Sequence, residues 1–423
     1  MTIARMGTLA ALVAVGVLAL SASVASAQGC QAQVGAQGAA PFTVWYCAGD
    51  EFGRQQTGTV ARMLDQVWSE ETRPEPDGLG PPIAPTANNG RISVYMTAPH
   101  VEVALGRCPD FCHSVGDLYG FAVGTAPFIK TATGTERSSA LMILNERIGI
   151  TDATVIHEFF HVLQYAHTSL ISSWLDEASS TWAEYYYRAS ETGRVHSFRE
   201  FQASTTSALS RKSLTHEYGA YVWLVWLTQR ARSPSAVFRL WSALEHATSD
   251  KPADVDHLVR SYLAGLGLGW GPSFNSFAVE GLNRNLSSVT PQLFSRGPFG
   301  DPAVPLGVTP RWVRPPWTLG VRARRTAVNL PQLSVHYEYV RGIAPTVKAV
   351  TISSSRIRPW GDVIVLAHSR LGWQRRDVNN GSFTFCRQTG RGNIDQLYLI
   401  ADNHDDLSAH SGGSYTVTGR RTC

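Results

Sequence analysis

The segment Asp152–His167 constrains the fold of this chain more than any other. Its apolar residues recur with helical periodicity and cover most of the circumference, which is typical of a helix in a protein interior. In its middle stand three ionisable side chains within five residues, His157, Glu158 and His161. Buried imidazoles and carboxylates are costly unless they share a partner. The fold must therefore bury this helix and provide a metal ion or hydrogen-bonding groups as partners for these side chains.

The spacing of these residues points to a metal ion. His157 and His161 are four residues apart in the pattern H-E-x-x-H, so on a helix both imidazoles face the same side. A zinc ion held there lowers the pKa of its bound water from about 16 to about 7, and the neighbouring Glu158 can take the proton. The alternative is a core helix whose histidines are satisfied by backbone groups and carboxylates.

A catalytic zinc needs a third protein ligand and an open fourth position. Glu177 follows His161 with 15 residues between, on the next predicted helix. A short connection makes two such helices antiparallel neighbours, which returns Glu177 toward the histidines. Glu184 lies seven residues further on the same face. It either orients a ligand or is simply solvated.

H-E-x-x-H followed by W-L-x-E-x-x-x-x-x-A-E resembles the gluzincin clan of zinc metallopeptidases, which includes the thermolysin and aminopeptidase-N types. The likeness is greatest to exported bacterial proteins with H-E-F-F-H-x-x-Q on the active helix, and it covers about residues 140–230. It implies one Zn²⁺ per chain, bound by His157, His161 and Glu177. It also implies that Glu158 acts as general base and acid, in a zincin-like domain with a small β-sheet and a helical subdomain.

The clan usually adds a Tyr or His that stabilises the oxyanion, and here His216 and Tyr218 are the candidates. The resemblance also implies that the strand at 140–148 is an edge strand, where an extended substrate would pair. The spacer before Glu177 is somewhat shorter than in the familiar members. Two residue patterns also depart from them. Thr181 stands where the thermolysin type has an Asp, and the G-x-M-E-N motif of the aminopeptidases is absent. The absence of this motif favours an endopeptidase over an aminopeptidase.

The N-terminus has the three parts of a secretory signal peptide. Arg5 precedes the apolar run Thr8–Leu20, and Ala25-Ser26-Ala27 forms a small-x-small cleavage signal. The run has 13 residues, fewer than the roughly 20 of a spanning helix. We therefore expect a secreted or periplasmic protein without stable membrane insertion after signal cleavage.

The cysteines agree with export. All six follow the expected cleavage point, and an even count in an exported chain predicts disulfides. Proximity in sequence favours the pairs Cys30–Cys47, Cys108–Cys112 and Cys386–Cys423.

The expected secondary structure changes from mixed to helical near residue 151 and to short strands after about residue 295. This predicts an α+β protein with separate parts along the chain. Residues 1–27 form the signal peptide, 28–150 the N-terminal α/β part of the catalytic domain, 151–295 its helical part, and 296–423 a C-terminal antiparallel β-sandwich. Before residue 150 we expect short strands between 28 and about 85 and two further strands at 91–97 and 140–148. The expected helices are 57–71, 152–167, 175–188, 215–231, 234–246, 252–265 and 273–285. The expected C-terminal strands are 333–340, 347–353, 362–367, 382–386, 396–401 and 414–417, with a hairpin turn at Asn379-Asn380-Gly381.

Charge limits the class of partner. The net charge is +4, from 37 basic and 33 acidic residues, and no basic block is present, so we expect no nucleic-acid partner. The expected partner is a peptide or protein substrate, with possible glycan or cell-surface contact through the C-terminal domain. Two alternatives stay open. One is a non-catalytic binding or adhesive protein with a relict zincin fold, and the other is a zinc hydrolase of non-peptide substrates.

Overall fold

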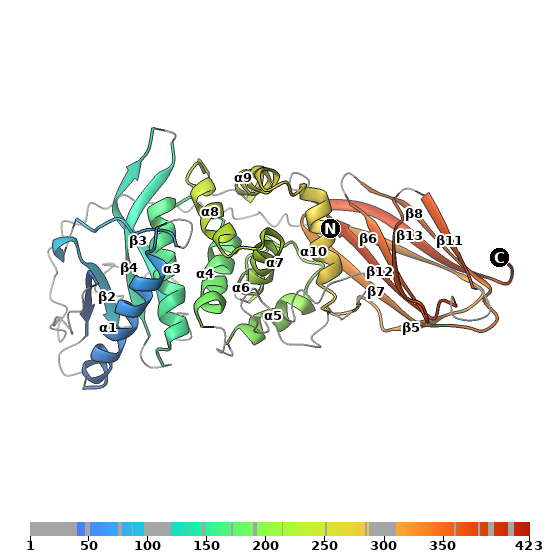
Figure 1. Ribbon diagram of the computed structural model, residues 1–423, viewed down its shortest axis with the longest axis horizontal. Coiled ribbons are helices and arrows are strands. Elements are labelled where there is room, and N and C mark those ends of the chain that lie inside the picture. Colours follow the sequence, from blue (N-terminus) through green and yellow to red (C-terminus); the bar gives the residue numbers. More distant parts are fainter. Residues whose placement is uncertain are drawn as a thin grey trace, which may run out of the picture.

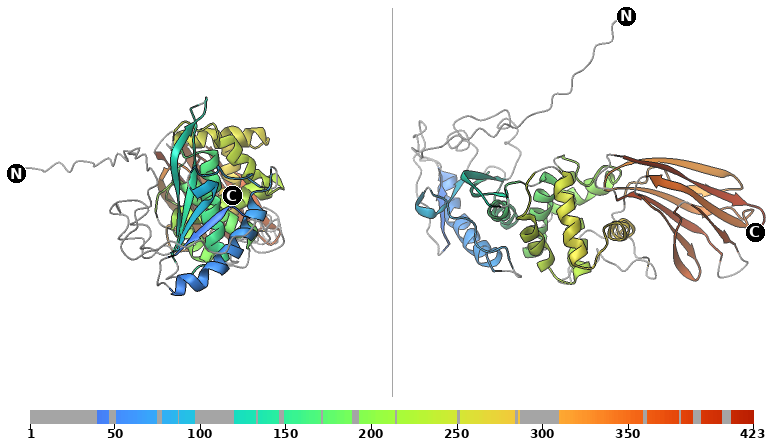
Figure 2. Two further views of the ribbon diagram at one scale, coloured as in Figure 1. Left: turned by 90° about the vertical axis from the view of Figure 1, so that its left-hand side faces the viewer. Right: turned by 90° about the horizontal axis from the view of Figure 1, so that it is seen from above.

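The computed structural model shows an elongated molecule in which the elements follow one another along the long axis in chain order (Figures 1 and 2). A small sheet with one long helix comes first, then a group of helices, then two further sheets. The structure describes residues 40–46, 51–74, 78–86, 88–96, 120–132, 134–145, 149–170, 172–188, 193–213, 215–249, 252–283, 286, 310–358, 361–379, 381–387, 393–404 and 410–423. The chain is thus a mixed α+β protein with helices and antiparallel sheets, as the sequence predicts.

The first sheet has four strands in the order β1-β2-β4-β3. The β1–β2 pairing and the β2–β4 pairing are parallel, whereas β3 pairs antiparallel with β4. The elements of this part are β1 (Phe42–Trp45), α1 (Glu51–Glu71), β2 (Ile92–Met96), β3 (Gly120–Lys130) and β4 (Glu136–Leu144). In β2 buried and half-buried residues alternate, because one face of the sheet lies on the core.

The expectation of an edge strand at 140–148 was wrong. β4 pairs with β3 on one side, and its residues Met142–Leu144 pair with β2 on the other, so β4 is an inner strand of the sheet. Among the described strands, β3 forms that edge of the sheet. β3 was not predicted from the sequence, because Gly124 and Pro127 interrupt the pattern of a strand.

The middle of the molecule is helical. Its elements are α3 (Asp152–His167), α4 (Ser173–Tyr187), α5 (Gly193–Ala203), α6 (His216–Gly219), α7 (Tyr221–Ala231), α8 (Ser235–Leu244), α9 (Pro252–Gly265) and α10 (Trp270–Glu280). The predicted bounds of α3 and α9 are confirmed, and Thr151 caps α3 by accepting the Thr154 N–H at 3.2 Å. α5 was not predicted. The helix expected at 215–231 is divided at Ala220 into α6 and α7.

The C-terminal part consists of two sheets. One has five strands in the order β10-β9-β12-β7-β5, and the other has four in the order β11-β8-β13-β6. Their strands are β5 (Trp317–Leu319), β6 (Ala323–Pro331), β7 (Ser334–Ile343), β8 (Ala349–Arg358), β9 (Val363–Ser369), β10 (Gly372–Asp377), β11 (Gly381–Cys386), β12 (Gln396–Asn403) and β13 (His410–Arg420). β5, β6 and β10 were not predicted.

The hairpin turn expected near Gly381 was also wrong. β10 pairs with β9, whereas β11 pairs with β8 in the other sheet. The connection after Asp377 therefore passes from one sheet to the other.

Two hydrophobic clusters hold these parts together. The larger extends from the first sheet through the helices and includes Tyr337 and Ile400 of the five-stranded sheet. Trp223, Trp226 and Trp241 lie in it almost fully buried, as core residues do. The smaller cluster contains residues of both C-terminal sheets. Burying apolar surface stabilises a fold by about 25 cal/mol per Å². The larger cluster therefore joins the helical part to the five-stranded sheet.

One predicted disulfide is confirmed and the others lie outside the described residues. Cys386 and Cys423 are bonded, with a Cα–Cα distance of 5.5 Å. The signal segment 1–27 and the remaining four cysteines, at positions 30, 47, 108 and 112, are not among the described residues. None of the helices in the described part of the chain combines the length and apolar character needed to cross a membrane.

Candidate metal centre

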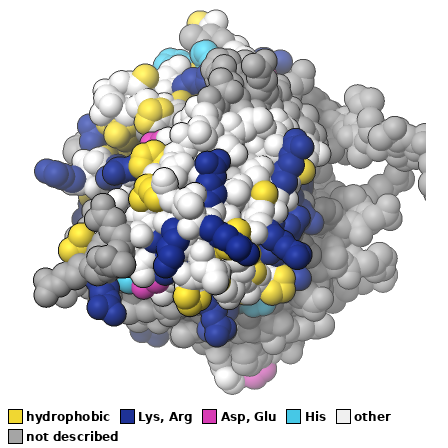
Figure 3. All heavy atoms as spheres, turned by 90° about the vertical axis from the view of Figure 1, so that its right-hand side faces the viewer, with side chains coloured by type: hydrophobic (Ala, Val, Ile, Leu, Met, Phe, Trp, Pro, Cys, Tyr) yellow, Lys and Arg dark blue, Asp and Glu magenta, His cyan; other side chains and the backbone are white. Residues whose placement is uncertain are grey.

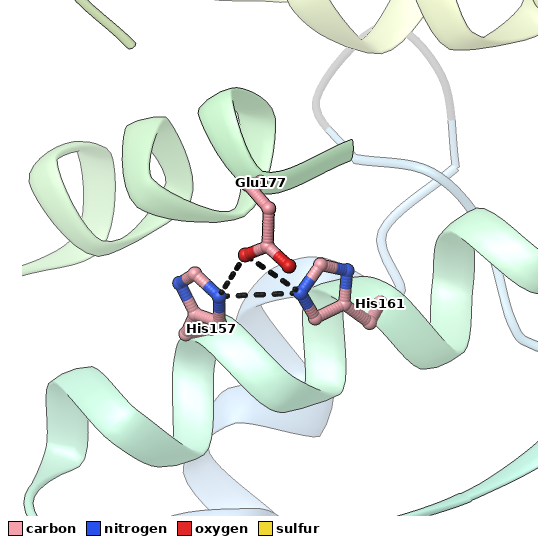
Figure 4. Close-up of side chains that lie close together, drawn as sticks. All are labelled: His157, His161 and Glu177. Atoms are coloured by element: carbon pink, nitrogen blue, oxygen red, sulfur yellow. Dashed lines mark hydrogen bonds and ion pairs between the residues drawn. The ribbon is translucent and has the colours of Figure 1, made fainter. Parts of the chain in front are cut away.

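His157, His161 and Glu177 converge between α3 and α4 (Figure 4). The Nε2 atoms of the two imidazoles are 3.2 Å apart. The Glu177 Oε2 atom lies 3.1 Å from His157 Nε2 and 3.6 Å from His161 Nε2. We call these three residues the His–Glu cluster. The structure thus brings together the three ligands that the sequence predicts.

Hydrogen bonds to the Nδ1 atoms of both histidines leave their Nε2 atoms facing the centre of the cluster. The His157 Nδ1 atom lies 2.7 Å from Glu184 Oε1, and the His161 Nδ1 atom lies 2.6 Å from Gln164 Oε1. Because these oxygens accept the Nδ1 protons, the Nε2 lone pairs of neutral rings face each other and Glu177. The Glu184 side chain is only 15% exposed, so it orients His157 rather than being simply solvated.

Two supporting residues around His161 were missed from the sequence. Gln164 also donates from Nε2 to the Asp176 carbonyl at 3.0 Å and to Ser179 Oγ at 2.8 Å. It therefore fixes the His161 ring and joins α3 to α4. The Asp176 carboxylate lies 3.2 Å from His161 Nδ1. The sequence did offer signals for both residues. Gln164 stands three residues after His161 on the same helix, and Asp176 directly precedes Glu177.

Glu158 is buried beside the His–Glu cluster. Gly120 of β3 leaves room for it, because a Cβ atom at that position would lie 2.9 Å from Glu158 Cγ. Burial raises the pKa of Glu158 to about 7, although His157 and His161 act in the opposite direction. Its Oε2 atom is buried and has no hydrogen-bond partner among the described residues. A carboxyl group with this pKa can both accept and release a proton near neutral pH.

The charges of the His–Glu cluster favour proton binding when no metal is present. Burial disfavours the charged form of His157, but hydrogen bonds to Glu177 and Glu184 outweigh it and raise the His157 pKa to about 10. Burial likewise opposes ionisation of Glu177, and His161 and His157 outweigh it, so the Glu177 pKa is lowered. A metal ion that takes the Nε2 lone pairs must displace the proton held there, and its affinity falls as the pH falls.

The structure separates the two oxyanion candidates. The Tyr218 ring stacks on His157, with ring centroids 5.4 Å apart and an angle of 15° between the planes. Burial and the nearby Glu177 and Glu158 carboxylates raise the Tyr218 pKa, so its hydroxyl remains a proton donor. The structure brings this residue to the cluster.

His216 has a different environment. Its Nδ1 lies 2.9 Å from Ser204 Oγ, its Nε2 lies 2.9 Å from the Ala208 carbonyl, and its ring contacts Phe201. Burial lowers the His216 pKa to about 4, so the ring is neutral at pH 7. The structure does not bring His216 to the His–Glu cluster, because its two nitrogens join the start of α6 to Ser204 and Ala208, in the segment that follows α5.

A second group of metal-binding residue types lies where α10 meets the five-stranded sheet. It consists of Asp362, Asp402 and His404. Its members are tied into a network, since Asn275 Nδ2 donates to Asp362 at 2.5 Å and His404 Nδ1 lies 3.2 Å from Asp402. It has one imidazole, whereas the His–Glu cluster has two and suits zinc better.

Glu184→Gln is expected to weaken metal binding by about 10–100-fold without unfolding the protein, because the variant loses the charge that orients His157. The measurement is competition between the purified protein and a zinc-sensitive chelating dye. Glu245→Gln is the matched control, since Glu245 forms an equivalent 2.6 Å contact with His167, which is outside the cluster. Equal affinity of the wild type and Glu184→Gln would contradict this role.

Comparisons with known proteins give no family assignment. Neither the models of known protein families nor the curated proteins provide a match to this chain. The function of the protein is therefore inferred from the chemistry of the His–Glu cluster and of the residues packed around it.

Proposed function

We propose that this protein is an exported zinc-dependent peptidase that cleaves within polypeptide chains. The observation that carries the proposal is the spacing of the three atoms of the His–Glu cluster. Tetrahedral zinc with bonds of about 2.0–2.1 Å requires ligand atoms roughly 3.3 Å apart. The distances of 3.1, 3.2 and 3.6 Å agree with that requirement.

The kinds of donor also fit zinc. Two neutral imidazoles and one carboxylate are a ligand set used by catalytic zinc, which keeps a fourth position for water. Glu184 and Gln164 accept protons from the far sides of the two rings, as the outer partners of zinc-binding histidines do. A histidine pair serving only the core would not need both Nε2 atoms turned toward one carboxylate.

Zinc, when bound, supplies a Lewis acid and lowers the pKa of a bound water to about 7. Glu158 accepts a proton from the attacking water through its buried, unpartnered oxygen. The water oxygen adds to the carbonyl carbon of the scissile peptide bond. As the C–N bond breaks, Glu158 returns the proton to the leaving nitrogen. A pKa of about 7 suits both transfers, because the group neither holds nor releases the proton too strongly.

Tyr218 then donates a hydrogen bond to the substrate oxygen that becomes negative. We expect Tyr218→Phe to lower kcat by about 100-fold, since one such donor is worth roughly 3 kcal/mol. Substrate binding and zinc content should change little. His216→Asn serves as the comparison and should leave kcat within about twofold. Similar losses in both variants, measured on a fluorogenic peptide, would contradict the assignment of the role to Tyr218.

The first sheet and the helices around α3 are proposed to form a zincin-like catalytic domain. The edge strand β3 passes beside Glu158 at Gly120. An extended substrate pairing with β3 would therefore lie along the cluster, which supports cleavage within a chain rather than at its end. The two C-terminal sheets share one hydrophobic cluster, which supports the proposal that they form a β-sandwich domain.

The test uses the purified protein beginning at Gln28, the N-terminus expected after signal cleavage. It should contain about one zinc per chain at the cluster and cleave unfolded casein. A chelator should abolish cleavage, and added zinc should restore it. A relict binding protein or a hydrolase of non-peptide substrates would bind zinc at the same place without cleaving casein. Zinc binding without cleavage of any peptide library would therefore contradict the peptidase proposal.

A further inference from the structure

Charge is divided unevenly along the chain. Residues 296–423 contain 17 basic and 8 acidic residues, a net charge of +9. Residues 28–295 contain 19 basic and 25 acidic residues, a net charge of −6. The small total charge of the protein results from the near-cancellation of these two parts. The C-terminal sheets therefore have an electrostatic field of their own.

The strand register carries several of these cations to one end of the C-terminal sheets. Arg420 ends β13 opposite Ala349, the first residue of β8. Lys348 lies beside them, because its N–H donates to the Arg420 carbonyl at 2.7 Å. Arg322, just before β6, accepts the Gly419 N–H through its carbonyl. Residues that are far apart in sequence thus meet at one end, which explains why no basic block is visible in the sequence.

Further cations complete this end. Arg370 lies in the turn between β9 and β10, and Arg341 lies near the end of β7. Six exposed cations define what we call the basic tip: Arg322, Arg341, Lys348, Arg370, Arg420 and Arg421. None of the six forms a salt bridge with a described residue.

Little negative charge balances the basic tip. Among the described acids at this end, Asp395 is half-exposed and is paired with His368 at 2.6 Å, and Glu338 is buried under the groove residues, 3.8 Å from Arg324. Figure 3 shows Lys and Arg side chains spread over this face with few acidic ones between them. Cations held near one another without partners repel, so a polyanion that neutralises them gains affinity by releasing its counterions.

A groove of about 580 Å³ opens at the basic tip. Trp317 lies in its lining, and the Arg324 guanidinium carbon is 4.3 Å from the centroid of the indole ring. Arg322 and Arg421 line the same groove, as do the hydroxyl-bearing residues Thr318 and Thr346. Arg324 covers one face of the indole, and the exposed part of Trp317, which is only partly buried, suits the apolar side of a sugar ring. Guanidinium groups suit the oxygens of sulfate, phosphate or carboxylate.

We propose that the basic tip binds an acidic polysaccharide, a polymer of sugars bearing sulfate, phosphate or carboxylate groups. One sugar unit lies in the groove at Trp317, and the surrounding cations pair with anions on the neighbouring units. The tip and the His–Glu cluster lie toward opposite ends of the long axis (Figure 1). A polymer bound at the tip therefore leaves the His–Glu cluster uncovered. This binding does not depend on the proposed peptidase activity.

The test measures binding of the purified protein to immobilised dextran sulfate and to uncharged dextran over a range of salt concentrations. We expect binding to dextran sulfate alone, weakening steeply with salt. The triple variant Arg322→Gln, Arg420→Gln and Arg421→Gln should bind at least tenfold more weakly and with a smaller salt slope. The matched control removes the same charge from exposed residues elsewhere, through Arg62→Gln, Arg211→Gln and Lys212→Gln, and should bind within about twofold of the wild type.

Three outcomes would overturn the proposal. The first is no binding to dextran sulfate by the wild type. The second is an equal loss in the two triple variants, which would show that only total charge matters. The third is tighter binding to phosphatidylglycerol vesicles or double-stranded DNA than to dextran sulfate at equal anion concentration. Thermal unfolding of both triple variants checks that neither loss results from unfolding.

Discussion

Glu158→Gln is expected to abolish peptide-bond cleavage while leaving the metal content of the protein unchanged. The amide has nearly the same size as the carboxylate, so it fits beside Gly120 without disturbing α3. It cannot accept the proton of the attacking water, and proton transfer by a positioned side chain contributes about 10²–10⁴-fold. Because the proposed mechanism uses Glu158 for both proton transfers, we expect kcat/KM to fall by at least about 10³-fold. Cleavage of a fluorogenic peptide measures the loss, and elemental analysis measures the zinc.

Two further variants sharpen this result. Glu158→Asp retains the carboxylate but moves it back by one methylene, so it should regain part of the activity. Glu245→Gln removes a histidine-paired carboxylate elsewhere in the molecule and should leave the activity intact. Wild-type activity in Glu158→Gln would contradict the role of Glu158 as base. Loss of zinc from Glu158→Gln would instead make the residue a part of the metal site.

Glu177→Gln is expected to remove both the zinc and the activity. Glu177 supplies the charged atom of the His–Glu cluster, and its Oε2 lies within 3.6 Å of both Nε2 atoms. An uncharged amide oxygen is a much poorer zinc ligand, so affinity should fall by more than the 10–100-fold expected for outer residues such as Glu184. Competition with a zinc-sensitive dye gives the affinity, and casein cleavage gives the activity.

The contrast between Glu177 and Glu184 is the informative part of this prediction. The Glu177 and Glu184 carboxylates both contact His157, at 3.1 and 2.7 Å, but from opposite sides of the ring. If both acted only as hydrogen-bond partners of a core histidine, the two Gln variants would have similar effects on zinc affinity. If Glu177 is a ligand, Glu177→Gln has the greater effect. The pair therefore separates a metal site from a buried ion-pair network.

The centre of the site could be predicted from the sequence because its geometry is local. Helical spacing alone places His157 and His161 on one face, and a short connection returns Glu177 to them. The bounds of α3 could be predicted because Thr151 offers a capping hydroxyl. The sequence could not decide between Tyr218 and His216 as the residue near the cluster. The orientation of the short helix α6 decides which of the two rings reaches α3, and that orientation depends on tertiary packing.

Features that depend on long-range pairing could not be predicted. Gly124 and Pro127 weaken the local signal of β3, which exists because its backbone pairs with β4. The neighbouring strands β10 and β11 join different sheets, although the residues between them are typical of a hairpin turn. The basic tip arises in the same way, from cations near the ends of separate strands. In each case tertiary contacts outweigh local preference.

The most direct test of the central claim is X-ray diffraction at the zinc absorption edge from crystals of the zinc-loaded protein. The structure predicts an anomalous peak between α3 and α4, about 2.0–2.1 Å from His157 Nε2, His161 Nε2 and a Glu177 carboxylate oxygen, with a fourth position left to water. A correctly folded protein with no zinc there, or with zinc bound only at Asp362, Asp402 and His404, would contradict the account.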